Sequence, residues 1–285
     1  MLRAFLGASL AGVASATTVH ASLKSLREDG MAVVCDPSVR IPVALVERLR
    51  VLVAEGRALG AATAGGIGFV SIVQGRHHAS LLQPNQPSVT ALGRWTAKVR
   101  AEVEAVVDAY KPLASAFFGD DRYVLSQCVR AAQSKAQRTT PLTPTSRLQL
   151  LAIDPGASAQ IWHRDNFAQG LTVIIPLVDV PSRSHGPTEL IPGTHHLTSL
   201  GDLPACASLC AHSGVQLGCA PSGCGLAFDS RVVHRGSPSS EYRPALVIRF
   251  DRPHTAPPGA GLLGTTMVRG LGALLHGVCA TTREL

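Results

Sequence analysis

The sequence Gln160-Ile161-Trp162-His163-Arg164-Asp165-Asn166 places a histidine and an aspartate two positions apart. On an extended backbone, side chains at positions i and i+2 project to the same face, so His163 and Asp165 can reach one metal ion. A third ligand has to come from elsewhere in the chain. His234 follows the apolar run 225–233, which predicts a strand that brings this histidine back to the first pair.

Two imidazoles and one carboxylate on a triangular face leave the opposite coordination positions open, as in non-haem Fe(II) sites. A histidine and an aspartate at this spacing also occur as a surface hydrogen-bonding pair. The order of the motifs decides between these interpretations, because a long β pattern separates the pair from His234. Nine residues further on, Arg243 supplies a guanidinium that can make two parallel hydrogen bonds to one carboxylate of a dicarboxylate.

Short β-branched runs separated by Gly, Pro and Asp dominate the sequence after Pro144. We expect strands at Arg147–Ile153, Gln160–His163, Leu171–Val178, Thr188–Ile191, Val215–Leu217, Gly225–Asp229 and Ala245–Asp251. Many short strands with turn residues between them are typical of a barrel or sandwich. The sequence therefore predicts a mainly β fold with flanking α-helices and a double-stranded β-helix (jelly roll, cupin-like) core.

The first half of the chain has a helical pattern instead. We expect helices at Lys24–Asp29, Val43–Leu59 and Leu92–Phe118, and a strand at Met31–Cys35. Pro112 should interrupt the last helix, because proline lacks the amide donor. Residues 65–88 are predicted to form a long loop. It contains the adjacent His77 and His78, but no third residue nearby could complete a metal site with them.

At 285 residues the chain is long enough for one full-sized core. We expect one domain over residues 23–256, with a helical part at 23–144 and the jelly-roll core at 145–253, and a Gly/Ala-rich tail at 257–285. Residues 1–22 predict a targeting leader or a disordered segment, with an ordinary first helix as the alternative. If the leader is a transit peptide, the protein is soluble and organellar or intracellular. Alternatively, Ala14-Ser15-Ala16 resembles a signal-peptidase cleavage site, which would indicate the secretory pathway.

The composition favours a small-molecule partner. The net charge is +7, but the basic residues are scattered singly, and an aromatic content of 4% leaves few platforms for stacking bases. We therefore expect no nucleic-acid partner. Because no apolar run reaches the roughly 18 residues that span a bilayer, we also expect no transmembrane segment.

Seven cysteines are an odd number, so they cannot all pair within the chain, and a reducing compartment is favoured. Cys206, Cys210, Cys219 and Cys224 could bind zinc, but their spacing lacks the two-residue separation of common structural sites. We expect these four to be small buried or loop thiols.

On these residues the chain resembles the phytanoyl-CoA dioxygenase family of Fe(II)/2-oxoglutarate-dependent oxygenases, over Leu23 to Pro253. The sequence motifs that carry the resemblance are, in chain order, Leu26–Val34, Leu148-Gln149 leading to Pro155-Gly156, Trp162-His163-Arg164-Asp165, Leu171–Leu177, Leu190–His195, and His234-Arg235-Gly236-Ser237-Pro238 before Arg243. Two loops depart from the family pattern, at Ser184–Thr188 and at Cys224, where an aspartate is usual. The insertion at 206–219 has no counterpart in the family.

The resemblance implies that His163, Asp165 and His234 bind iron and that Arg243 anchors the distal carboxylate of 2-oxoglutarate. Gln149 and Thr172, on predicted strands, are further candidates for contact with this cosubstrate. The resemblance also implies O2 as the second cosubstrate, ascorbate as a supporting reductant, and the release of succinate and CO2.

Related halogenases have a small residue in the position of the carboxylate, so Asp165 implies hydroxylation, or another oxidation such as desaturation, of a small-molecule substrate. His195 is expected to be structural or pocket-lining, and Trp162 to lie in the core. Two other functions remain open. One is a non-catalytic jelly-roll protein that binds a metal or ligand as a sensor, and the other is a zinc-dependent hydrolase.

Overall fold

The computed structural model describes residues 16–62, 70–80, 91–125, 148–197, 203–253 and 255. The helices are α1 (Ala16–Glu28), α2 (Val43–Ala62), α3 (Ala91–Phe118) and α4 (Leu203–Ser213), with a short 3-10 helix η2 (Thr194–His196). The strands are β1 (Met31–Val34), β2 (Val70–Val73), β3 (Arg76–Ser80), β4 (Val124–Leu125), β5 (Leu148–Ile153), β6 (Gly170–Pro176), β7 (Thr188–Leu190), β8 (Gln216–Gly218), β9 (Gly225–Asp229), β10 (His234–Gly236) and β11 (Arg243–Asp251).

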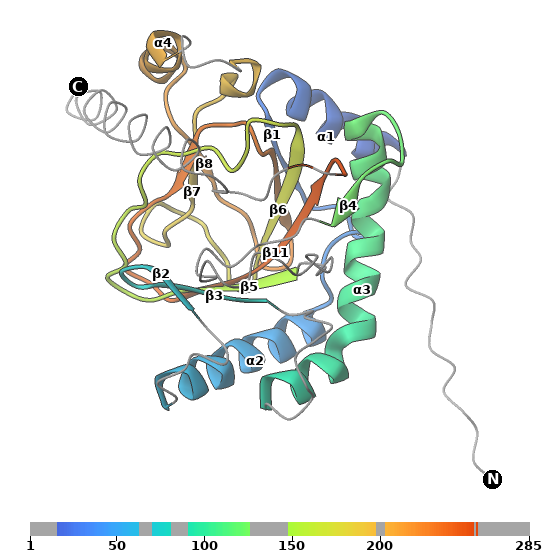
Figure 1. Ribbon diagram of the computed structural model, residues 1–285, viewed down its shortest axis with the longest axis vertical. Helices are drawn as coiled ribbons and strands as arrows, with labels where there is room; N and C mark the ends of the chain where they lie inside the picture. Colours follow the sequence, from blue (N-terminus) through green and yellow to red (C-terminus); the bar gives the residue numbers. More distant parts are fainter. Residues whose placement is uncertain are drawn as a thin grey trace, which may run out of the picture.

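The strands form two antiparallel sheets (Figure 1). The larger sheet has the order β1-β9-β6-β11-β5-β3-β2, with β4 also paired to β11, and the smaller sheet has the order β10-β7-β8. Neighbours in space are mostly distant in sequence, as in a jelly roll. The predicted fold class, a jelly-roll core with flanking helices, is confirmed.

Side chains alternate between the two faces of the larger sheet, because successive residues of a strand point to opposite sides. On β11, Leu246 and Ile248 belong to the hydrophobic core that the sheet shares with the helices. Arg243, Val247 and Arg249 instead line a cavity on the opposite face. The same alternation holds along β5 and β6, so one face of the sheet stabilises the fold and the other builds the site.

Helices α1, α2 and α3 cover the apolar face of this sheet, and Figure 1 shows α2 and α3 beside the sheet region that contains β5 and β11. Leu49 and Leu52 of α2 and Tyr110 of α3 are fully buried in the shared core. Burying three side chains of this size removes several kcal/mol of unfavourable apolar hydration. The amphipathic helices predicted from the sequence therefore supply packing.

Two predictions about the helical half are wrong. The predicted loop at 65–88 contains the hairpin β2–β3, which extends the larger sheet through β5. Its signal was weak because both strands are short and β3 is mostly polar. Helix α3 runs through Pro112 to Phe118. The hydrogen bond lost at Pro112 is offset by the burial of Leu113 and Ala114 just beyond it.

Two predictions about the β half also need correction. The segment expected to be a strand at Gln160–His163 is irregular, apart from a single bridge between His163 and His234. Helix α4 overlaps the insertion at 206–219, where no helix was predicted.

The two ends of the chain are described only in part. Helix α1 begins at Ala16, inside the predicted leader at 1–22, while residues 1–15 and the predicted tail at 257–285 lie outside the described residues. Within the described ranges, no helix combines the length and apolar character needed to cross a membrane.

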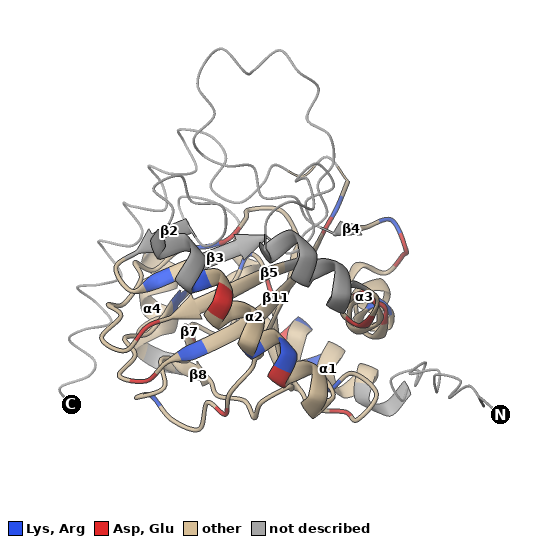
Figure 2. Cartoon of the chain, turned by 90° about the horizontal axis from the view of Figure 1, so that it is seen from below, with Lys and Arg blue, Asp and Glu red and all other residues tan. Residues whose placement is uncertain are grey.

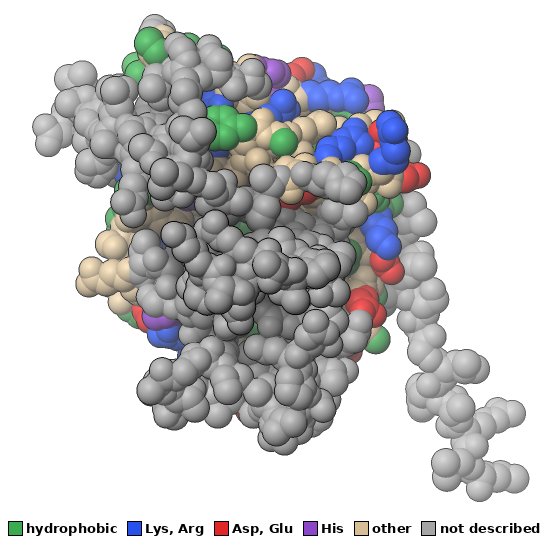
Figure 3. Space-filling view, viewed as in Figure 1, with side chains coloured by type: hydrophobic (Ala, Val, Ile, Leu, Met, Phe, Trp, Pro, Cys, Tyr) green, Lys and Arg blue, Asp and Glu red, His purple; other side chains and the backbone are tan. Residues whose placement is uncertain are grey.

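Figure 2 shows that basic and acidic residues are interspersed along the described elements. In Figure 3, basic and acidic side chains lie together along the edge that α1 and α3 form. Several are paired there, including Lys24 with Glu28 at 4.0 Å and Lys111 with Asp108 at 2.7 Å. Exposed pairs of this kind contribute little to stability.

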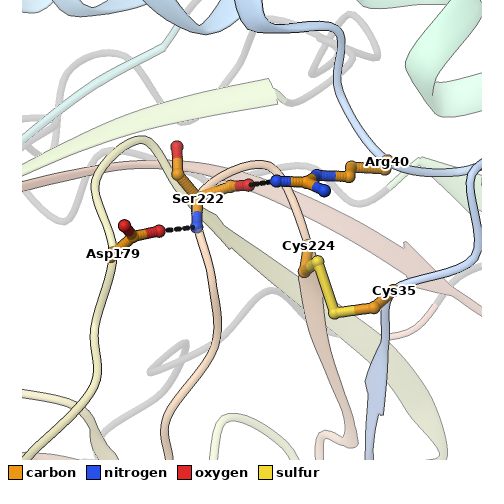
Figure 4. Close-up of a disulfide and its surroundings, with 5 residues drawn as sticks. All are labelled: Cys35, Arg40, Asp179, Ser222 and Cys224. Carbon is orange, nitrogen blue, oxygen red and sulfur yellow. Dashed lines mark hydrogen bonds between the residues drawn. A yellow bond between two sulfur atoms is a disulfide. The ribbon is translucent and has the colours of Figure 1, made fainter.

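A disulfide between Cys35 and Cys224 joins the segment after β1 to the turn before β9 (Figure 4). The same turn is held by Ser222, whose amide donates to Asp179 at 2.8 Å and whose carbonyl accepts a bond from Arg40 at 3.4 Å. The cross-link therefore fixes β1 at the edge of the larger sheet.

This pairing corrects two expectations about the cysteines. Cys210 is disulfide-bonded as well, whereas Cys206 and Cys219 are not in disulfides. The free-thiol prediction is therefore wrong for Cys210 and Cys224, and the four cysteines do not form a shared zinc site. Since disulfides persist in oxidising surroundings, the basis for expecting a reducing compartment is also removed.

Replacing Cys35 with serine should lower the free energy of unfolding by about 2–4 kcal/mol, because the unfolded chain loses a long-range constraint. The bridged residues are 189 positions apart. Urea unfolding without reductant measures the effect, and Cys219→Ser, which removes a free thiol, is the control. Equal midpoints for the two variants would show that the disulfide does not stabilise the fold.

Candidate metal centre

The backbone of the His163 segment is held against β10. The amide of His163 donates to the carbonyl of His234 at 2.9 Å, and the amide of His234 donates back at 2.8 Å. Between the two predicted ligands, Arg164 points the other way and donates to the carbonyls of Leu197 and Thr194. The alternation expected from the sequence is therefore present locally, although the segment forms no regular strand.

This pairing brings the three predicted ligands together. One ligand atom from each of His163, Asp165 and His234 lies within 4.8 Å of the others, and this is the one such group among the described residues. Oδ1 of Asp165 is 4.0 Å from Nε2 of His163 and 3.7 Å from Nε2 of His234. The three atoms form a triangle that can hold one metal ion.

Both imidazoles are oriented for metal binding. Nδ1 of His163 lies 2.8 Å from the carbonyl oxygen of Ile161, and Nδ1 of His234 lies 2.9 Å from that of Val232. A carbonyl only accepts hydrogen bonds, so each Nδ1 must carry the proton. The Nε2 lone pairs are therefore free to face the ion, and the rings are held in place.

The charge states also suit a metal. Burial, and then the neighbouring His163, lower the pKa of His234 to about 4. Burial alone would raise the pKa of the Asp165 carboxyl, but Arg249 and the two imidazoles hold the pKa below its usual range. Near neutral pH, His234 is therefore neutral and Asp165 is ionised, as metal binding requires.

A cavity of about 190 Å³ extends from the triad over the polar face of the larger sheet. Gln149 of β5 and Thr172 of β6 both line it, together with apolar residues such as Phe228 and Ile174. Gln149 and Thr172, the two further candidates for contact with the cosubstrate, therefore line the same cavity as the triad. The hydroxyl of Thr172 also donates to Oδ2 of Asp165 at 3.2 Å.

The part of the cavity away from the triad is cationic. Arg243 of β11 and Arg76 of β3 both lie opposite Ile153, on either side of β5. Burial, with a smaller contribution from the charge of Arg76, lowers the pKa of Arg243 to about 9. Burial lowers the pKa of Arg76 to about 10, so both remain cationic at neutral pH.

These guanidiniums lack acidic partners within the described residues. Arg76 donates to the backbone carbonyls of Ser158 and Ser237. Nε of Arg243 is buried and has no hydrogen-bond partner. Two buried cations without a counter-charge are costly unless an anion enters the cavity. This end therefore fits a carboxylate.

Gly236 makes room for Arg76. A Cβ at this position would lie 2.5 Å from Nη1 of Arg76 and 2.8 Å from its Cζ, closer than carbon atoms pack. Gly236 belongs to the His-Arg-Gly phrase that begins at His234. This motif therefore supplies a predicted metal ligand and the space for a cation at the other end of the cavity.

Sequence reasoning missed Arg76 and Arg249, which both line the cavity. Arg76 fell in a segment predicted to be a loop, so nothing indicated which way it faces. Arg249 did carry a signal, because it lies on the predicted strand Ala245–Asp251, and its even spacing of six residues from Arg243 places both side chains on one face if the strand begins at Arg243.

The other histidines and Trp162 lie outside the triad. Nε2 of His195 bonds to the carbonyl of Arg27 at 3.1 Å, which gives His195 a structural role. His77 bonds to Asp154 at 3.1 Å. Trp162 is fully buried in a second apolar cluster, as expected, with the guanidinium of Arg235 4.5 Å from the ring centroid.

Several solved structures with a similar fold are described as those of non-haem enzymes. The chain is similar to AviO1 from Streptomyces viridochromogenes Tue57, at 20% identity and a TM-score of 0.53, covering 84% of this chain and 97% of that one. The alpha-ketoglutarate-dependent carbocyclase SnoK from nogalamycin biosynthesis matches at 14% identity and a TM-score of 0.56, covering 87% and 91%.

A third match is the epimerase SnoN in complex with Fe3+, alpha ketoglutarate and nogalamycin RO, at 16% identity and a TM-score of 0.53, covering 88% of this chain and 89% of that one. At such identities the likeness establishes the fold. No protein-family model matches the chain, and no curated protein does either.

Replacing His234 with alanine should abolish binding of one equivalent of Co(II), a spectroscopic substitute for Fe(II), because a triangular site loses one of three ligands. Visible absorption during an anaerobic Co(II) titration measures this. His77→Ala removes a histidine outside the triad and should bind like the wild type. Loss of binding in the His77 variant but not in the His234 variant would contradict the assignment.

Proposed function

We propose that this protein is a non-haem Fe(II)- and 2-oxoglutarate-dependent oxygenase that hydroxylates a small-molecule substrate and releases succinate and CO2. One observation carries the proposal. A single cavity has a two-histidine, one-carboxylate triad at one end and, at the other, two buried arginines that have no acidic partner among the residues the structure describes. A dicarboxylate that chelates a metal through one end fits such a cavity.

The donor set fits iron. His163, Asp165 and His234 would occupy one face of the ion and leave the opposite face open, which is the arrangement of non-haem Fe(II) oxygenases. Iron and 2-oxoglutarate, when bound with O2, would supply the oxidising power that replaces a C–H bond of the substrate by C–OH. The similarity in fold to enzymes described as alpha-ketoglutarate-dependent supports this choice.

The residues of this chain would orient and shield the reaction. Arg243 would fork onto the distal carboxylate of 2-oxoglutarate, with Arg76 as a second cation beside it. Gln149 would contact the cosubstrate from the cavity floor. Apolar Ile174 and Phe228 would restrict water near the metal, which strengthens these electrostatic contacts.

Asp165 favours hydroxylation over halogenation, because it fills the coordination position that a halide would need. The fold itself permits other outcomes, since its relatives include an epimerase and a carbocyclase. Identifying the product is therefore part of the test. We further propose that the substrate is a small molecule, in line with the nogalamycin compound bound to SnoN.

Purified protein supplied with Fe(II), ascorbate and O2 should convert 2-oxoglutarate to succinate and CO2, and Asp165→Ala should abolish the conversion because the carboxylate ligand is lost. Succinate is measured by mass spectrometry. His77→Ala is the control for a polar substitution outside the cavity.

Three outcomes would reject the proposal. Full turnover by Asp165→Ala would show that the triad does not hold the metal. Tight 2-oxoglutarate binding with no O2 uptake across a broad substrate panel would indicate a sensor. One equivalent of zinc in protein purified without chelators, with no activity restored by iron, would indicate a hydrolase.

A further inference from the structure

The two oxygens of the Asp165 carboxylate have different surroundings. Oδ1 faces the imidazole nitrogens of His163 and His234, at 4.0 and 3.7 Å. Oδ2 faces Nη1 of Arg249 at 3.3 Å and the hydroxyl of Thr172 at 3.2 Å. One oxygen is therefore directed at the ion, while the other is engaged by two donors from the sheet.

Arg249 and Thr172 are placed by the register of the larger sheet. They are direct cross-strand partners on β11 and β6, so their side chains leave the same face side by side. Arg249 is also held from behind, because its Nε lies 3.1 Å from Oδ2 of the buried Asp251. The guanidinium is thus fixed between two carboxylates, and only one of them belongs to the metal site.

We propose that Arg249 and Thr172 are positioning residues that hold Asp165 as a monodentate ligand, by occupying Oδ2 so that only Oδ1 reaches the ion. The inference rests on the proposed function and adds a role that the triad alone does not supply. It also gives Thr172 a different task from contact with the cosubstrate.

Denticity matters because the open coordination positions are few. Three protein ligand atoms leave half of an octahedron free, which suffices for a chelating 2-oxo acid and O2. If Asp165 bound through both oxygens, it would compete for one of these positions. A guanidinium at Oδ2 neutralises the charge on that oxygen. Its charge-assisted hydrogen bond also opposes the rotation of the carboxylate that would bring Oδ2 to the ion.

Another role for Arg249 is direct contact with an anion. Its Nη2 is buried and has no hydrogen-bond partner, and the residue lines the cavity. A residue that only bound the cosubstrate would affect the affinity for 2-oxoglutarate and leave the metal site unchanged. The two roles therefore predict different measurements.

The test uses Co(II) loaded into the full chain, with two readouts that do not depend on turnover. Co(II) affinity should fall about 10- to 100-fold in Arg249→Met, the usual effect of removing an outer contact to a metal ligand. The infrared difference spectrum with and without Co(II), in protein labelled with 13C-aspartate, reports denticity. The gap between the antisymmetric and symmetric carboxylate stretches is wide for a monodentate carboxylate and narrow for a chelating one.

We expect a wide gap in the wild type, a narrower gap in Arg249→Met and partial recovery in Arg249→Lys, which keeps the charge. Thr172→Val removes one donor at nearly constant volume and should shift the gap in the same direction by less. Arg231→Met is the matched control, because it breaks the 2.6 Å pair of Arg231 with buried Asp229 and leaves Asp165 untouched.

Failure of this inference can be separated from failure of the proposed function. If the wild type binds no Co(II) through the triad, the metal site itself is wrong. If the wild type binds Co(II) while Arg249→Met and Thr172→Val keep its affinity and infrared gap, the positioning role is wrong. A raised KM for 2-oxoglutarate with an unchanged gap would assign Arg249 to the cosubstrate instead.

Discussion

The antiparallel register of β11 between β5 and β6 determines which side chains reach the cavity. Because side chains alternate along a strand, this register sends Leu246 and Ile248 into the helical core and Arg243 and Arg249 to the other side. A shift of one residue would exchange the two sets and bury charge among apolar helices. The packing that stabilises the fold therefore also fixes the position of the site.

Charge separates the two ends of the cavity. At one end, Asp165 is surrounded by two imidazoles and the guanidinium of Arg249, while at the other end Arg76 and Arg243 have no carboxylate among the described residues. A buried cation without a partner is unfavourable, whereas its attraction to an incoming anion is strong in such surroundings. The two buried guanidiniums therefore destabilise the empty protein, and the binding of an anionic ligand would relieve this free-energy cost.

Much of this was predictable from local patterns. The spacing of His163 and Asp165, the short β-branched runs after Pro144 and the position of Arg243 just before a predicted strand are local features, and the fold class followed from them. Arg76 could not be predicted, because its orientation depends on the pairing of β3 with β5, a contact between segments about seventy residues apart. The pairing of Cys35 with Cys224 was hidden for the same reason, since its partners meet only in the folded chain.

The central claim is that one dicarboxylate bridges the metal and the cationic pair. Anaerobic titration of 2-oxoglutarate into Fe(II)-loaded protein tests it most directly, because chelation through the 2-oxo acid end gives a visible metal-to-ligand charge-transfer band. We expect a saturable band in the wild type and roughly 10- to 100-fold weaker binding in Gly236→Ala, whose methyl group displaces Arg76, in line with the loss of a charged hydrogen bond. A wild-type protein that binds Fe(II) but develops no band, or equal affinity in the two proteins, would contradict it.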